Sequence, residues 1–97
     1  TVVDAKAAAA DLKKLQNDEV AAVRIAATEA LANMGDRRSG IVGFTKILKE
    51  TKDDMVALEA MNVAAALGIT GDIPKDVFDQ AAKLGSYPKR MAEDYPR

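Results

Sequence analysis

The chain has 97 residues, 48% of them apolar and 30% charged, which is the composition of one modest folded domain rather than of a disordered segment. Its 14 basic and 15 acidic residues give a net charge of −1, so there is no general attraction to nucleic acid or to an anionic membrane. No apolar run approaches the roughly 18 residues needed to span a bilayer. We therefore expect neither nucleic acid nor a membrane as partner.

The first predicted helix covers residues 3–16. One face carries small and aliphatic residues at steps of three and four: Ala5, Ala8, Leu12 and Leu15. Asn17 and Asp18 break this pattern, and either side chain can cap the next helix.

The second predicted helix, residues 19–34, carries the longest apolar stripe of the chain. Its expected inward residues are Val20, Val23, Ile25, Ala27, Ala30, Leu31 and Met34. Gly35 follows in the position where a left-handed residue commonly ends a helix. Residues 36–40 then form a polar connector, and a shorter helix follows over 41–50. Its expected inward residues are Ile41, Phe44, Ile47 and Leu48.

In the second half, residues 51–54 form a polar turn before a helix over 55–67, which Gly68 ends. A loop over 69–73 leads to Pro74, a residue suited to the first turn of a helix that runs to about Leu84. A last short helix is expected over 87–94. No segment alternates apolar and polar residues as a strand does, so we expect an all-α chain of about six helices.

A shift of 33 residues superposes the helix ending at Gly35 on the helix ending at Gly68, and Phe44 falls near Phe78 with one inserted residue. A helical pair cannot bury both its faces alone, so repeated pairs stack into a solenoid. We therefore predict one domain, 1–97, with the fold of a short α-α superhelix. It divides into a half repeat (1–17), a repeat (18–50), a degenerate repeat (51–84) and a C-terminal cap (85–97).

Residues 18–36 contain, in this order, an Asp in a turn, a Val-Arg pair, an Ala-Leu pair and a Gly-Asp pair that ends the helix. This pattern resembles HEAT-like repeats of the PBS-lyase type, which have an armadillo-like fold. The resemblance implies that Asp18 and Arg24 belong to a structural ladder between successive units. Ala57 stands where Arg24 would repeat, and the pattern departs from the family there.

A narrower resemblance concerns residues 56–62 and the stretch Tyr-Pro-Lys-Arg-Met at 87–91. Both look similar to the HEAT-like tails that follow the catalytic domain in some bacterial sulfatases. This resemblance implies a C-terminal accessory domain of a larger hydrolase. The sulfatase motif, with its Cys or Ser converted to formylglycine, is not in the sequence.

Catalytic chemistry has few candidate residues. The sequence contains no histidine and no cysteine, and its two serines, Ser39 and Ser86, follow breaks where helix capping is the usual role. The pair Asp53-Asp54 suits a helix start, and no loop offers the ligand spacing of a calcium site. The glycine-rich residues 68–72 lack the Lys-Ser/Thr of a phosphate loop. We expect no enzyme activity in this fragment, no cofactor and no metal site.

The one basic cluster consists of Arg37, Arg38, Lys46 and Lys49. These residues are the candidates for contact with an acidic protein partner. The alternative is a solvated surface, because Asp36 and Glu50 interleave with them. A terminal group, Tyr87, Arg90, Met91 and Tyr95, is expected to pack as a cap on the last layer or to form a docking patch.

From these features we expect a non-catalytic helical-repeat module, or scaffold, that binds a protein partner or an adjacent domain. The alternative is the accessory domain of a sulfatase. A scaffold would be cytoplasmic and a sulfatase tail periplasmic or secreted, so the sequence leaves the compartment open. The start at Thr1 rather than Met suggests an excised fragment of a longer protein.

Overall fold

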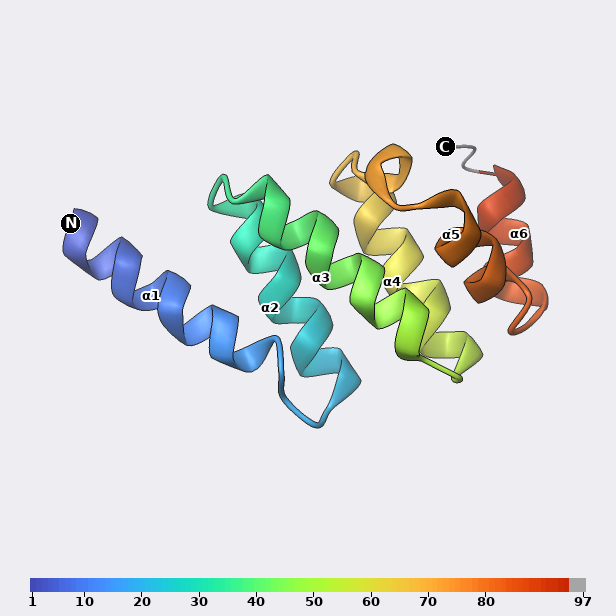
Figure 1. Cartoon of the computed structure of the whole chain (residues 1–97), viewed down its shortest axis with the longest axis horizontal. Coiled ribbons are helices and arrows are strands. Elements are labelled where there is room, and N and C mark those ends of the chain that lie inside the picture. Colours follow the sequence, from blue (N-terminus) through green and yellow to red (C-terminus); the bar gives the residue numbers. More distant parts are fainter. Residues whose placement is uncertain (95–97) are drawn as a thin grey trace.

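The computed structural model describes residues 1–94, which form six α-helices and a 3-10 turn, with no strand among them. The elements are α1 (Val2–Leu15), α2 (Ala21–Asn33), α3 (Arg37–Glu50), α4 (Asp54–Ala66), η1 (Thr70–Asp72), α5 (Lys75–Ala82) and α6 (Ser86–Asp94). Successive helices run back and forth along an elongated body (Figure 1). The predicted all-α fold of six helices is confirmed.

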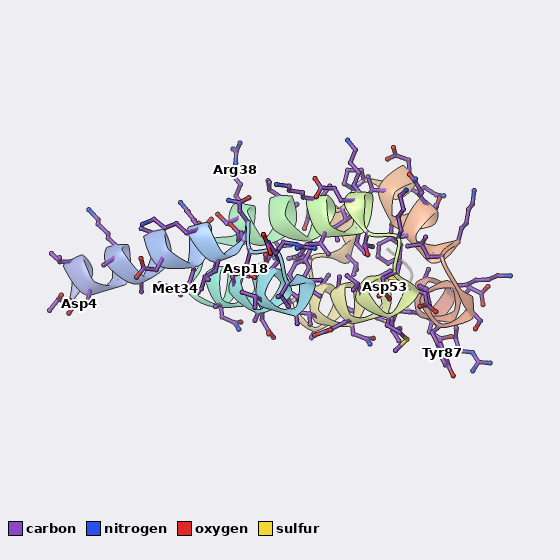
Figure 2. All side chains as sticks on the ribbon, turned by 90° about the horizontal axis from the view of Figure 1, so that it is seen from below. Asp4, Asp18, Met34, Arg38, Asp53 and Tyr87 are labelled. Atoms are coloured by element: carbon purple, nitrogen blue, oxygen red, sulfur yellow. The ribbon has the colours of Figure 1, made fainter. Side chains whose placement is uncertain are left out.

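The helices lie in two layers, with α1, α3 and α5 in one and α2, α4 and α6 in the other (Figure 2). α2 packs against α1, α3 and α4, and α3 packs against α4 and α5, while α6 closes on α4 and α5. From α2 onward, each helix contacts neighbours in both layers, as in a short α-α superhelix, and α1 packs on α2. The molecule measures 43 × 25 × 17 Å.

The 33-residue period appears in the helix boundaries. α2 begins at Ala21 and ends at Asn33, and α4 begins and ends 33 residues later, at Asp54 and Ala66. Gly35 and Gly68 follow with positive φ angles of 96° and 72°. The backbone bonds after each helix also correspond: Gly35 N to Ala32 O, Asp36 N to Leu31 O, Gly68 N to Ala65 O and Ile69 N to Ala64 O. Both helices therefore end in a Schellman motif, and the predicted glycine stops are confirmed.

The turns that precede α2 and α4 correspond as well. The backbone N–H of Val20 donates to the Asp18 carboxylate at 2.8 Å, and that of Asp53 donates to the Thr51 hydroxyl at 3.1 Å. Asp18 therefore closes the turn before α2 instead of capping the helix. The N-cap residue of α2 is Val20, which supplies no side-chain cap.

The start of α3 differs from the sequence prediction. The helix begins at Arg37, and Asp36 is its N-cap, with a carboxylate that accepts the Ser39 N–H at 3.1 Å and the Ser39 hydroxyl at 2.6 Å. Gly40 is buried against α2, where an added Cβ would lie 2.9 Å from the Ala32 Cβ. The expected connector is mostly the first turn of the helix, because a cap and a close packing contact outweigh its polar composition.

The core lies between the two layers. Its largest fully buried side chains include Phe44 of α3 and Phe78 of α5, the two residues that the repeat places at equivalent positions. Ile47 and Leu48 are also buried, as expected, and Ile41 is half-buried. The remaining cluster is aliphatic or small: Ile25, Ala57, Ala60, Met61, Ala64, Ile69, Ile73, Val77, Ala81 and Met91.

Two predicted inward faces at the N-terminal end are only partly buried. On α2, Ile25, Ala27 and Leu31 are buried as expected, and Val23 and Ala30 are half-buried. Val20 and Met34 of α2 are 56% and 47% exposed. On α1, Leu12 is half-buried, whereas Leu15 and the alanines of the same stripe, Ala5 and Ala8, are exposed. At the equivalent positions of the next unit, Leu67 is partly buried against the core, whereas Asp53 is exposed.

At the C-terminal end, α6 packs its Pro88 and Met91 side chains inward. Tyr87 points outward and is 61% exposed. Arg90 is exposed, and Tyr95 lies outside the described residues. The expected cap therefore rests on Pro88 and Met91, and Tyr87 takes no part in it.

Candidate functional site

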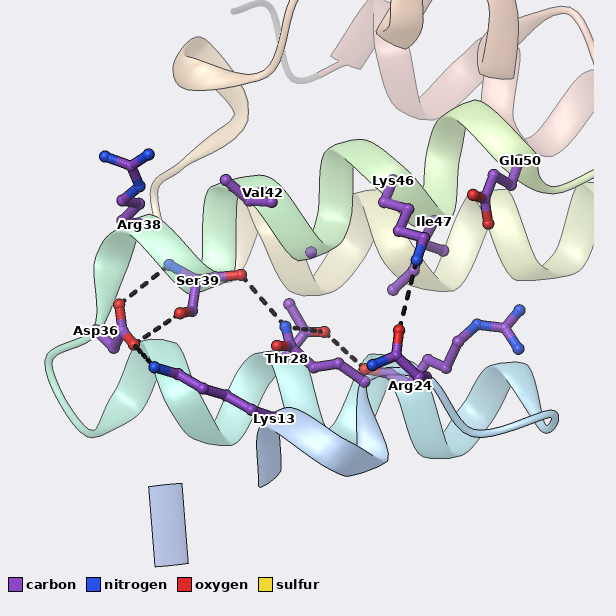
Figure 3. A pocket seen from close by; sticks show the side chains of 13 residues that line it. Lys13, Arg24, Thr28, Asp36, Arg38, Ser39, Val42, Lys46, Ile47 and Glu50 are labelled. Carbon is purple, nitrogen blue, oxygen red and sulfur yellow. Dashed lines mark hydrogen bonds and ion pairs between the residues drawn. The ribbon is translucent and has the colours of Figure 1, made fainter. Parts of the chain in front are cut away.

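A groove of about 500 Å³ runs between α1 and α3 and has α2 as its floor (Figure 3). We call it the α1–α3 groove. Its charged lining consists of four cations and two carboxylates: Lys13, Arg24, Arg38, Lys46, Asp36 and Glu50. Figure 3 shows Arg38 at one end of the groove and Glu50 at the other. In a chain with a net charge of −1, this groove gathers an excess of positive charge.

The floor is fixed by hydrogen bonds that join three helices. The Gln16 amide, just after α1, donates to the Thr28 hydroxyl at 3.1 Å and to the Ser39 carbonyl at 3.3 Å. Thr28 is buried, and its hydroxyl donates to the Arg24 carbonyl at 2.7 Å. Gly43 leaves room for this contact, because an added Cβ would lie 2.5 Å from the Thr28 Cγ2 atom. These bonds join the floor of the groove to α1 and α3.

Most of the cations are not neutralised within the described residues. The Arg24 guanidinium donates through Nη1 to the carbonyls of Asp18 and Glu19, at 2.8 and 3.0 Å. The Lys46 ammonium is 3.5 Å from the Asn17 amide oxygen. Both partners are neutral oxygens, so each side chain keeps its charge available to an anion.

The remaining pair at the groove is Lys13 with Asp36, whose charged atoms are 4.0 Å apart. The hydrogen bonds from the Ser39 side chain and backbone lower the pKa of the Asp36 carboxyl below its usual value of 3.8, with a smaller contribution from Lys13 and Arg38. Asp36 is thus ionised and already engaged with Ser39 and Lys13. It does not neutralise the cations at the other end of the groove.

The structure separates the four basic residues predicted to contact a partner. Arg38 and Lys46 line the α1–α3 groove. Lys46 also borders a second, more apolar groove of about 570 Å³ between α3 and the start of α5, which Lys49 lines. Arg37 turns away from both, and its guanidinium pairs with Asp72 and donates to the Gly68 carbonyl at 3.3 Å. Arg37 therefore fastens α3 to the loop that follows α4.

Asp18 and Arg24, the expected ladder residues, are neighbours in the structure. The guanidinium contacts the backbone carbonyl of Asp18, while the Asp18 carboxylate accepts the Val20 N–H. The pair therefore stabilises the turn before α2 through the backbone. An ion pair between these two side chains is not formed.

Two groove cations were not expected to contact a partner. No sequence pattern indicated that Lys13 belongs to a binding site, because its position near α3 depends on how α1 packs on α2. Arg24 did give a signal, since it replaces the small residue found at the same position of the next unit, Ala57. An arginine in place of a core alanine indicates a position with access to solvent.

The comparisons with protein-family models, with curated proteins and with solved structures found no match for this chain. Residues 1–94 contain no group of three or more acidic side chains placed to hold a metal ion. Over the same residues, no helix has both the length and the apolar character needed to cross a membrane.

Proposed function

We propose that this chain is a non-catalytic, HEAT-like repeat module that binds a protein partner over α3 and the grooves on its two sides. The observation that carries the proposal is the α1–α3 groove, which holds cations without carboxylate partners above a hydrogen-bonded floor. Binding sites with fixed geometry avoid the entropic cost of ordering on association. The resemblance of residues 18–36 to HEAT-like repeats supports the same reading, because solenoids use their extended surfaces for binding.

Affinity capture with the whole chain as bait tests this function. The double variant Lys46→Glu/Lys49→Glu reverses two charges that line the grooves. We expect it to lose most of the partner that the wild type recovers. Lys83→Glu is a matched control, because Lys83 is exposed on the equivalent side of the second unit, beyond both grooves. Equal recovery by the double variant and the control would contradict the proposal.

A second candidate function is supported by the exposed apolar stripe of α2. Val20 and Met34 lie at the N-terminal end of the stack, where an adjacent helix or domain would bury them. This end would then dock the module onto a catalytic domain, as in the sulfatase tails that the sequence resembles. The complete open reading frame tests this candidate. An upstream sulfatase motif with its Cys or Ser supports it, and an uninterrupted run of helical repeats contradicts it.

A further inference from the structure

We propose that the α1–α3 groove binds an extended peptide of a protein partner, with acidic, apolar, acidic and basic residues at alternate positions. The inference rests on the proposed function and names the class of partner. Four exposed side chains of α3 line the groove at steps of four residues: Arg38, Val42, Lys46 and Glu50. The last three also border the second groove, so they form the ridge between the two. The order of the four is cation, apolar, cation, anion, and the peptide pattern is its complement.

The spacing of these side chains suits an extended peptide. Four residues of an α-helix advance by about 6 Å along its axis. Alternate residues of an extended chain are about 6.7 Å apart and point to the same side. Residues one, three, five and seven of an extended peptide can therefore lie opposite Arg38, Val42, Lys46 and Glu50 along the groove.

The charges assign each peptide position. The first acidic residue meets Arg38, which makes no hydrogen bond or ion pair within the described residues. The second meets Lys46, with Arg24 on the opposite side of the same end of the groove. Val42 is 57% exposed between the two cations and accepts an aliphatic side chain. Glu50 closes the pattern and favours a basic residue at the last position.

The same charges favour a peptide over a nucleic acid. A phosphate backbone carries its negative charges without interruption, so one of them would face Glu50. A peptide can place acids beside Arg38 and Lys46 and a base beside Glu50. The exposed side chains along this ridge include no aromatic residue on which a base could stack.

The first test is a fluorescence-anisotropy titration of the whole chain with a labelled peptide, Glu-Ser-Val-Ser-Glu-Ser-Lys, flanked by serines. We expect saturable binding that weakens as salt rises, since exposed ion pairs are screened. Lys46→Glu should weaken binding about tenfold, and the Lys83→Glu control should leave it unchanged. A peptide of the same composition with its two glutamates adjacent should bind about tenfold more weakly.

A charge exchange tests the register. Replacing the second glutamate of the peptide by lysine should abolish binding to the wild type. The Lys46→Glu variant should bind this changed peptide more tightly than it binds the original one. Circular dichroism spectra that match the wild type show that the exposed substitution has left the fold intact.

Three results would overturn the inference. The first is equal binding of the peptide with adjacent glutamates, and the second is the absence of rescue in the charge exchange. The third is an oligonucleotide that competes as well as the peptide, which would indicate a general polyanion surface. If no peptide binds while affinity capture still depends on Lys46 and Lys49, the inference fails and the proposed function stands. If capture shows no such dependence, the proposed function fails.

Discussion

The helical pairs α2–α3 and α4–α5 differ mainly in what surrounds them. α2 and α4 have the same length, the same glycine stop and the same hydrogen-bonded turn before them, all offset by 33 residues. Yet Met34 of α2 is 47% exposed, and the equivalent Leu67 of α4 packs partly buried against the core. Local sequence thus sets where these helices begin and end, and their neighbours set which faces are buried.

One pair of equivalent residues distinguishes the two units at the α1–α3 groove. Ala57 is fully buried where α3 packs on α4. Arg24 holds the same position of α2, beside α1, and is half-buried in the groove. A small residue lets two helices approach closely, whereas an arginine keeps its charged end in water. The groove therefore lies where the second unit has a packed interface.

The largest expected effect comes from exchanging these two residues. Ala57→Arg forces a long charged side chain into a fully buried site, so we expect a loss of about 4 kcal/mol or more in the free energy of unfolding. Arg24→Ala removes hydrogen bonds to two carbonyls at a half-exposed site and should cost about 1 kcal/mol. Urea unfolding of both variants measures the difference. Similar losses would mean that the two positions are not distinct environments.

Gly43→Ala tests the close approach of α3 to α2. The added methyl group would lie 2.5 Å from Thr28 Cγ2, and Thr28 is buried and β-branched, so it cannot easily turn aside. Alanine gains about 1 kcal/mol over glycine in a helix, and overpacking costs about 1–3 kcal/mol. We expect a net loss of up to about 2 kcal/mol in thermal or urea unfolding. Gly71→Ala, with no atom within 4 Å of the new methyl group, is the control and should show no such loss.

Gly35→Ala and Gly68→Ala test the equivalence of the two helix stops. Both glycines have positive φ, and neither would bring a new Cβ into contact. The cost is therefore the backbone strain alone, about 1–2 kcal/mol for each variant. Melting temperatures that fall by similar amounts would support the equivalence. A much larger fall for one variant would show that its stop has a further role.

Asp36 has no capping equivalent in the second unit, where the N-cap of α5 is Pro74. Asp36→Ala should cost about 1 kcal/mol, and Asp36→Asn should retain most of the cap. Folding lowers the pKa of the Asp36 carboxyl. Its ionised form therefore contributes its full stabilisation at pH values above the pKa of the unfolded chain, near 3.8. This contribution is lost as the pH falls through the lower, folded pKa. Unfolding of wild type and Asp36→Asn between neutral pH and about pH 3 should show a steeper loss for the wild type.

The sequence by itself determined the helical class, the number of helices, the 33-residue period and the two glycine stops. These features depend on local spacing and on backbone freedom at Gly35 and Gly68, which can be read along the chain. It also placed Phe44 and Phe78 in the core and put Arg38 and Lys46 among the candidate binding residues. It misplaced the start of α3, because a composition rich in arginine and serine hides the cap at Asp36.

Only the tertiary structure decided which faces are covered and which cations share a groove. Val20 and Met34 follow the same periodicity as buried residues, yet they lie at the two ends of α2 and are exposed. Lys13 and Lys46 are far apart in sequence and line one groove because α1 and α3 both pack on α2. Periodicity defines a face of a helix, but packing of distant segments determines what that face meets.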